Sequence, residues 1–173
     1  MTQFANEYDL VDGIQMHEEN PEHFHIPHDL LKKYLAVGQF IELRIDSPRF
    51  SVHPDAPEAC TCPVCSGEAR KPIIGHPIPM SLMKVQGAPV PSRGWGEDFW
   101  VRIVSRDGEQ LQGRVDNHLH ETKLHGVEFN DVIEFTLDHV LAIHPIHREA
   151  LVLSMAPEEV KEFAIWLGSL RAE

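Results

Sequence analysis

The sequence has few cysteines and few basic residues. Its 173 residues include three cysteines, and 15 lysines and arginines stand against 27 aspartates and glutamates, for a formal net charge of −12. Three neighbouring cysteines cannot form a disulfide framework that joins distant elements. The acidic excess repels phosphate backbones and anionic membranes, so we expect no nucleic-acid partner. A basic protein is the better candidate partner, although acidity also simply favours solubility.

Long apolar runs are missing as well. No run approaches the roughly 20 residues that a membrane-spanning helix needs, and the first ten residues lack the basic and apolar regions of a secretory signal. We therefore expect a cytoplasmic protein with no membrane partner. A composition of 42% hydrophobic and 24% charged residues is ordinary for a globular protein, and the length suits one domain over residues 1–173.

Familiar catalytic motifs are absent from the sequence. It contains no serine in a nucleophile elbow, no glycine-rich phosphate loop and no His-Glu-x-x-His pair. Catalysis has no positive support, and we expect a protein that is not an enzyme.

The apolar pattern predicts an α+β fold built on a small antiparallel sheet or partly closed barrel. Alternation of apolar and polar residues predicts strands over 40–45, 98–105, 110–115 and 132–137, with 140–143 extending or following the last. Asp107-Gly108 lies between two of these runs and is a strong hairpin signal. The sheet should therefore have four or five strands.

Two helices are expected beside this sheet. Apolar spacing over residues 29–35 predicts a short helix in the amino-terminal half, after an irregular stretch over residues 1–27. Pro157 opens a second helix over residues 157–171. Its apolar stripe comprises Val160, Phe163, Ala164, Leu167 and Leu170. We expect this stripe to pack on the sheet, with docking onto a partner as the alternative.

The segment over residues 47–93 reads as an irregular insertion rich in proline and cysteine. A structureless loop of this length is uncommon in a compact domain, so a bound metal is an economical way to order it. Its cysteines have the spacing Cys60-x-Cys62-x-x-Cys65, which resembles a zinc-ribbon turn. We therefore predict a proline-rich zinc-knuckle insertion.

A structural zinc ion needs four ligands, and the three cysteines supply three. We place His76 first and His53 second as the fourth ligand, with Asp55 as a further candidate. The alternative to a zinc site is that the three cysteines are exposed loop thiols that bind no metal. A redox Cys-x-x-Cys lacks its usual βαβ context, and a catalytic zinc would need a base such as Glu58.

A second histidine cluster comprises His118, His120 and His125, with Glu121 among them. His118 and His120 are two residues apart, so on a strand they would lie on one face and could chelate a transition metal. We favour the other interpretation, that these residues belong to a polar surface loop. Trp95, Trp100 and Trp166 could anchor a partner, although a tryptophan within a strand, as Trp100 is, more often belongs to the core.

Several motifs resemble a known bacterial family. The matching stretches are Phe99-Trp100-Val101, Gly113-Arg114-Val115-Asp116-Asn117, Asn130-Asp131-Val132-Ile133-Glu134-Phe135 and Asp138-His139-Val140, with Glu22 to Pro27 and Val37 to Ile41 upstream. Over roughly residues 20–45 and 96–140 the chain resembles an uncharacterised family of domains of unknown function, the 2314 group. The resemblance implies a small sheet-rich module of the kind met in toxin-immunity and stress settings. It implies no activity and no metal ligand, and the cysteine-containing insertion departs from it.

These observations favour a non-enzymatic protein-binding module, such as an immunity protein that neutralises a basic toxin, with a structural zinc site. The alternatives are a metal-dependent enzyme that uses one of the two clusters, and a subunit of a larger assembly.

Overall fold

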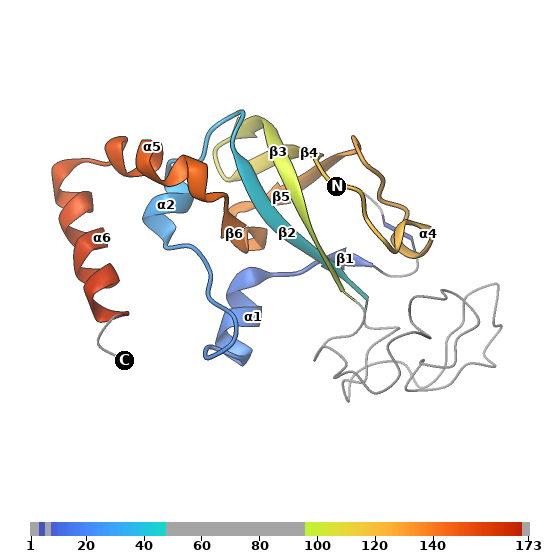
Figure 1. The fold of residues 1–173 in the computed structure, drawn as a ribbon, viewed down its shortest axis with the longest axis horizontal. Helices are drawn as coiled ribbons and strands as arrows, with labels where there is room; N and C mark the ends of the chain where they lie inside the picture. Colours follow the sequence, from blue (N-terminus) through green and yellow to red (C-terminus); the bar gives the residue numbers. More distant parts are fainter. Residues whose placement is uncertain (1–3, 6–7, 48–95, 171–173) are drawn as a thin grey trace.

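The structure is a computed structural model, and it describes residues 4–5, 8–47 and 96–170 (Figure 1). The predicted insertion over residues 47–93 lies outside these residues, apart from Ser47.

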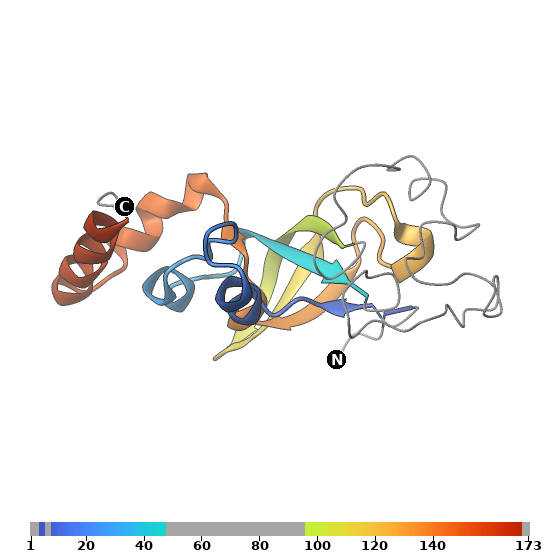
Figure 2. The same cartoon turned by 90° about the horizontal axis from the view of Figure 1, so that it is seen from below.

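The described part of the chain has an α+β fold around one antiparallel sheet that curls into a nearly closed barrel (Figure 2). The strands run β1-β2-β3-β4-β5 across the sheet, and β6 pairs with β2. Their bounds are β1 Asp9–Leu10, β2 Phe40–Asp46, β3 Glu97–Asp107, β4 Gln110–Val115, β5 Val132–Thr136 and β6 Ala142–Ile143. The predicted class and the longer predicted strands are confirmed.

Alternation along the strands places one face of the sheet in the core. On β2, Ile41 and Leu43 are fully buried, and their partners on β3, Val101 and Phe99, are fully buried as well. Each such side chain contributes roughly 1.5–3 kcal/mol when it leaves water. The cross-strand pairs therefore fix the register, because a slip of one residue would expose all of them.

The β3–β4 hairpin turns at the predicted Asp107-Gly108, where Gly108 has a positive φ of 60°. Further along β4, Gly113 lies close to the side chains of Val101 on β3 and Phe135 on β5. A Cβ atom there would lie 2.8 Å from Cγ2 of Val101 and 2.9 Å from Cε1 of Phe135. A side chain at this position would push β3 and β5 apart, so the absence of one lets the barrel wall close tightly.

The helices and short 3₁₀ turns are α1 Gly13–Glu19, α2 Asp29–Lys33, α4 Thr122–His125, α5 Arg148–Leu153, α6 Pro157–Ser169, η3 Leu137–His139 and η4 Pro145–His147. Helices α2, α5 and α6 lie at one end of the barrel, and α4 lies at the other end (Figure 1). The expectation of an irregular stretch over residues 1–27 is wrong for β1 and α1. Asp12 begins α1 by accepting hydrogen bonds from the amides of Ile14 (2.9 Å) and Gln15 (3.0 Å), which satisfies two of the unpaired donors of a helix start.

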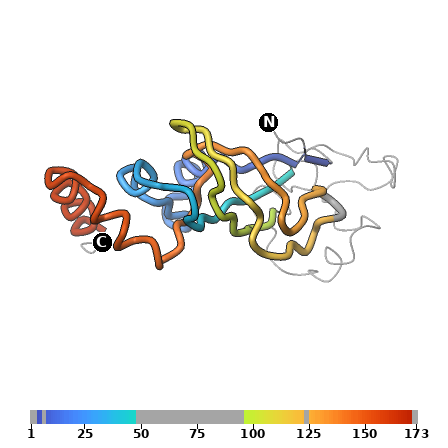
Figure 3. Tube along the Cα trace, turned by 90° about the horizontal axis from the view of Figure 1, so that it is seen from above, coloured from blue at the N-terminus to red at the C-terminus, as the bar shows by residue number. Residues whose placement is uncertain are grey.

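The carboxyl-terminal helix α6 starts at Pro157, as predicted, and projects from the end of the molecule beside α5 and α2 (Figures 1 and 3). Its inward contact is aromatic. The His28 ring lies 5.7 Å from Phe163 and 4.8 Å from Trp166, centroid to centroid. The expectation that the whole stripe packs on the sheet is therefore wrong, since Phe163 is buried while Val160, Leu167 and Leu170 are exposed.

Candidate partner-binding surface

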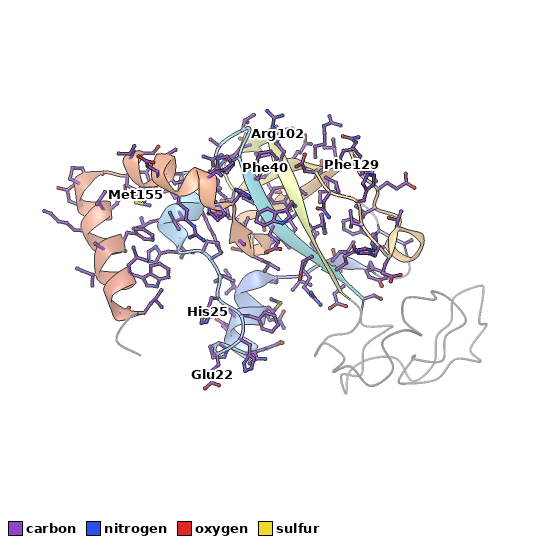
Figure 4. The ribbon with its side chains drawn as sticks, in the orientation of Figure 1. Glu22, His25, Phe40, Arg102, Phe129 and Met155 are labelled. Carbon is purple, nitrogen blue, oxygen red and sulfur yellow. The ribbon has the colours of Figure 1, made fainter. Side chains whose placement is uncertain are left out.

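Exposed apolar side chains gather on α5, α6 and the turn before them. Of the ten large hydrophobic residues that are exposed in the described part of the chain, six lie between residues 146 and 170, so the remaining four are spread over a much longer stretch. These six, which we call the α5–α6 surface, are Ile146, Leu153, Val160, Ile165, Leu167 and Leu170. Figure 4 shows Met155 at the junction of the two helices.

The geometry of α6 explains why it carries apolar residues on two sides. Each residue of a helix turns about 100°, so Ile165 lies roughly 200° around the axis from the buried Phe163. Ile165 is 76% exposed, and Leu153 at the end of α5 is 78% exposed. Val160, Leu167 and Leu170 lie within about 60° of Phe163 and are only partly covered, whereas Ile165 lies on the opposite side and remains in water.

Glu159 anchors α6 to α2. One carboxylate oxygen lies 2.5 Å from Nζ of Lys33, and the other accepts hydrogen bonds from the Tyr34 hydroxyl (2.5 Å) and from the Ala156 amide (2.8 Å). The hydrogen bonds from Lys33, Tyr34 and Ala156 outweigh desolvation and lower the pKa of Glu159 to about 2. This anchor and the aromatic contact hold α6 in place without burying its outer side.

A cavity of about 490 Å³ lies between α6 and the rest of the molecule. Its walls are mainly apolar and include Ile26, Ile143, Val152, Phe163 and Leu167, and Arg148 and His25 also line it. Figure 4 shows His25 on the segment between α1 and α2. The volume falls within the range of roughly 300–1,000 Å³ that is typical of ligand pockets, and it could hold apolar side chains of a partner.

Acidic side chains are interspersed with this apolar surface. Glu149 follows the start of α5, and Glu158 and Glu162 lie on α6, all three exposed, while the exposed Arg148 and Lys161 lie on the same two helices. Since the whole chain has a formal charge of −12, a partner with lysines or arginines around an apolar patch complements this surface in both respects.

All five predicted zinc ligands lie outside the described residues. They are Cys60, Cys62, Cys65, His76 and His53. The zinc site therefore stays a prediction.

The second histidine cluster does not converge. His118 packs against Phe129 with ring centroids 4.9 Å apart, whereas His125 is buried and its Nε2 lies 3.4 Å from Oε2 of Glu97. Among residues 4–5, 8–47 and 96–170, no group of three histidines, cysteines or carboxylates is arranged to hold a metal. His125 is a buried residue, which neither the metal-site nor the surface-loop interpretation foresaw.

Glu97 and His125 instead fasten the loop after β4 to the start of β3. Glu97 accepts hydrogen bonds from the amides of His120 (2.5 Å) and Glu121 (2.9 Å), while Nδ1 of His125 accepts one from Val127 (3.0 Å). Burial alone would raise the pKa of Glu97, but the hydrogen bonds from His125 and these amides lower it below its ordinary value. No sequence signal links the two residues, because they lie far apart along the chain.

An aromatic recess of about 380 Å³ lies on the outer face of the sheet. Trp100 lines it and meets His144 edge to face at 5.4 Å, and Phe40 lines it as well. Trp100 is half-buried on this face, so the expectation that it belongs to the core is wrong; its neighbour Phe99 occupies the core. Trp166 is half-buried on α6, and Trp95 lies outside the described residues.

No family model matches the chain, and no curated protein or solved structure matches it significantly. The resemblance to the 2314 group therefore stays a prediction. Within the described ranges, no helix combines the length and apolar character needed to cross a bilayer.

Proposed function

We propose that this chain is a protein-binding module that docks a basic partner on its α5–α6 surface. The observation that supports the proposal is the concentration of exposed apolar side chains over residues 146–170, while the barrel core is packed without them. Large exposed apolar patches on globular proteins commonly mark interaction sites.

The exposed apolar side chains would supply part of the binding free energy. Burying one leucine or isoleucine is worth roughly 1.5–3 kcal/mol, and association costs about 4–15 kcal/mol in lost translational and rotational freedom. The five leucines and isoleucines and Val160 are 36% to 78% exposed, so only that part of each side chain is available for burial against a partner. Leu153 and Ile165 should contribute most, because they are the most exposed members of the set.

The net charge of −12 supports a basic partner. Opposite charge speeds diffusional encounter and disfavours partners of the wrong sign. The resemblance to the 2314 group favours an immunity protein within this class, whose partner would be a basic toxin. We also propose that this module has a structural zinc site in its cysteine-containing insertion.

The test is a pulldown from native cells at low ionic strength, with identification of the captured proteins by mass spectrometry. The bait is the full chain, compared with a Leu153→Glu/Ile165→Glu variant. Val37→Glu is the matched control, because Val37 is 62% exposed but lies in the loop between α2 and β2.

The expected result is one basic protein that the wild type and the Val37 control retain and the double variant loses. Equal capture by all three baits, or an acidic partner, would contradict the proposal. Circular dichroism of the double variant checks that its fold is intact.

A further inference from the structure

The side of α6 that carries Phe163 faces a cavity instead of a fully packed core. This cavity has a volume of about 490 Å³, and α6 contributes Phe163, Trp166 and Leu167 to its walls. Leu167 is still 42% exposed, although it lies only about 40° around the helix from the buried Phe163. Protein interiors are close-packed, and voids much larger than a water molecule are few. An apolar occupant of this space would therefore bury surface that the fold leaves uncovered.

The other walls come from several parts of the fold. The segment before α2, α2 itself, β6 and α5 contribute Ile26, Leu31, Ile143 and Val152 in that order, and Figure 1 shows α2 and α5 beside α6. Walls that converge from so many elements enclose an irregular space. A flexible aliphatic chain can follow such a space more easily than a rigid planar ring.

The charge on these walls is cationic. Arg148, at the start of α5, keeps its charge at every physiological pH, and His25 is the other titratable residue of the described lining. Within the described residues the Arg148 guanidinium has no ion pair or hydrogen bond. Glu22 and Glu149 are close to these two residues in sequence, but neither lines the cavity. A lining whose described residues include no carboxylate, in a chain of net charge −12, favours an anionic group.

We infer that this cavity binds a monocarboxylate with an aliphatic chain, whose carboxylate pairs with Arg148 and whose chain lies against α6. Arginine presents a planar fork of donors that matches the geometry of a carboxylate. A cationic head group would lie beside Arg148 without a counter-charge, and an uncharged chain would gain the apolar contact alone. The carboxylate thus distinguishes this ligand from an apolar side chain of a partner, and the inference does not depend on a protein partner.

The test compares three probes with the same eight-carbon chain, namely octanoate, 1-octanol and octylammonium. By isothermal titration calorimetry at physiological ionic strength, we expect the full-length protein to bind octanoate about tenfold more tightly than octanol, which corresponds to one charged hydrogen bond. Octylammonium should bind no more tightly than octanol. This order reports the local charge of the cavity, because the net charge of −12 favours the cation over the anion at long range.

Arg148→Met should lower the affinity for octanoate to that for octanol and leave the affinity for octanol unchanged. Lys161→Met is the matched control, because it removes an equal charge from an exposed position on α6 outside the cavity lining. Val152→Phe should weaken the binding of octanoate and octanol alike, because the larger side chain fills part of the cavity. Circular dichroism checks the fold of each variant. Should Val152→Phe fail to fold, Leu167→Trp fills the cavity from α6.

No binding of octanoate at millimolar concentration, an unchanged preference for octanoate in Arg148→Met, or full binding of octanoate by a folded cavity-filling variant would overturn the inference. Equal binding of octanoate and octanol by the wild type would overturn it as well, and would leave the cavity to an apolar side chain of a partner.

Discussion

At the scale of single residues, Glu97 and Lys32 represent opposite consequences of burying a charge. Glu97 is surrounded by donors, which compensate for the water that its carboxylate loses. Lys32 has no acceptor for its amine in the described part of the molecule. A carboxylate with donors is stabilised in its charged form, and an amine without acceptors is destabilised in its charged form.

Replacement of Glu97 by glutamine should lower the free energy of unfolding by about 1–2 kcal/mol near neutral pH, because hydrogen bonds to a charged acceptor are stronger than those to an amide. The folded pKa of Glu97 lies below its ordinary value. Its contribution is therefore present above the ordinary pKa of a glutamate and disappears as the pH falls through the lower folded pKa.

Urea unfolding over a pH series measures this difference. Wild type and Glu97→Gln should converge in acid, and Glu128→Gln, at an exposed position, should match the wild type throughout. A difference that persists unchanged to the lowest pH would mean that the carboxylate charge is not the cause.

Replacement of Lys32 by methionine should increase the free energy of unfolding by about 1–3 kcal/mol at neutral pH, because it removes an unpaired buried polar group and keeps the apolar stem. The folded pKa of Lys32 is lowered, so the folded state binds this proton less tightly than the unfolded state. The penalty is complete below the folded pKa and disappears as the pH rises to the ordinary lysine pKa.

The stabilisation by Lys32→Met should accordingly shrink in alkaline solution, which thermal unfolding at several pH values can measure. A variant less stable than the wild type at neutral pH would show that Lys32 has a structural partner.

At the scale of elements, sequence patterns predicted the strands better than the helices. Alternation identified β2, β3, β4 and β5, because one face of each strand is buried and the other is wet. The Asp107-Gly108 pair also predicted the β3–β4 turn correctly. Helix α1 was missed, because seven residues between Asp12 and Asn20 depend on a local cap and give too few turns for a clear period.

The candidate surface was only partly predictable. The carboxyl-terminal helix and its stripe were visible in the sequence, but the contact of Trp166 with His28 was not, and that contact decides which side of α6 turns inward. Pairs such as Glu97 and His125 are formed by the tertiary fold alone. The unpaired state of Lys32 likewise follows from the arrangement of α1, α2 and η3, and a lysine within a short helix gives no sign of it.

Substitution of Glu159 by glutamine should loosen α6 from α2. The substitution removes the ion pair with Lys33 and weakens the hydrogen bonds from Tyr34 and Ala156. Hydrogen exchange should become faster for the amides of α6 while those of the barrel strands keep their rates. Because the folded pKa of Glu159 is about 2, the anchor should persist in moderate acid and be lost only as the pH falls towards that value.

Glu158→Gln is the matched control. Glu158 is exposed and directly precedes Glu159, so its substitution removes an equal charge without touching the anchor. Equal exchange rates for α6 in Glu159→Gln and the wild type would show that the aromatic contact alone holds the helix.

The predicted zinc knuckle is the element with the sharpest chemical test. The purified chain should retain about one zinc ion, and Cys62→Ser should lose it, because a structural site needs its full set of ligands. Elemental analysis measures the metal, with Thr61→Ser as a conservative control in the same segment. Protein free of metal after purification without chelators would refute the site.

At the scale of the whole molecule, one property belongs to no single element: the excess of 27 acidic over 15 basic residues. Such a charge acts over about a Debye length, roughly 10 Å at 0.1 M salt, and it affects the rate of encounter more than the lifetime of a complex. The apolar side chains of the α5–α6 surface act at contact, so they should determine dissociation.

Charge and apolar contact should therefore separate in the kinetics of partner binding. Raising the ionic strength, or the change Glu158→Lys/Glu162→Lys on α6, should slow association and leave dissociation nearly unchanged. Leu153→Glu/Ile165→Glu should instead accelerate dissociation, because it removes apolar burial at the interface. Surface plasmon resonance with the captured partner measures both rates. Association that is insensitive to salt would exclude a basic partner steered by the acidic field, even if the apolar contact were real.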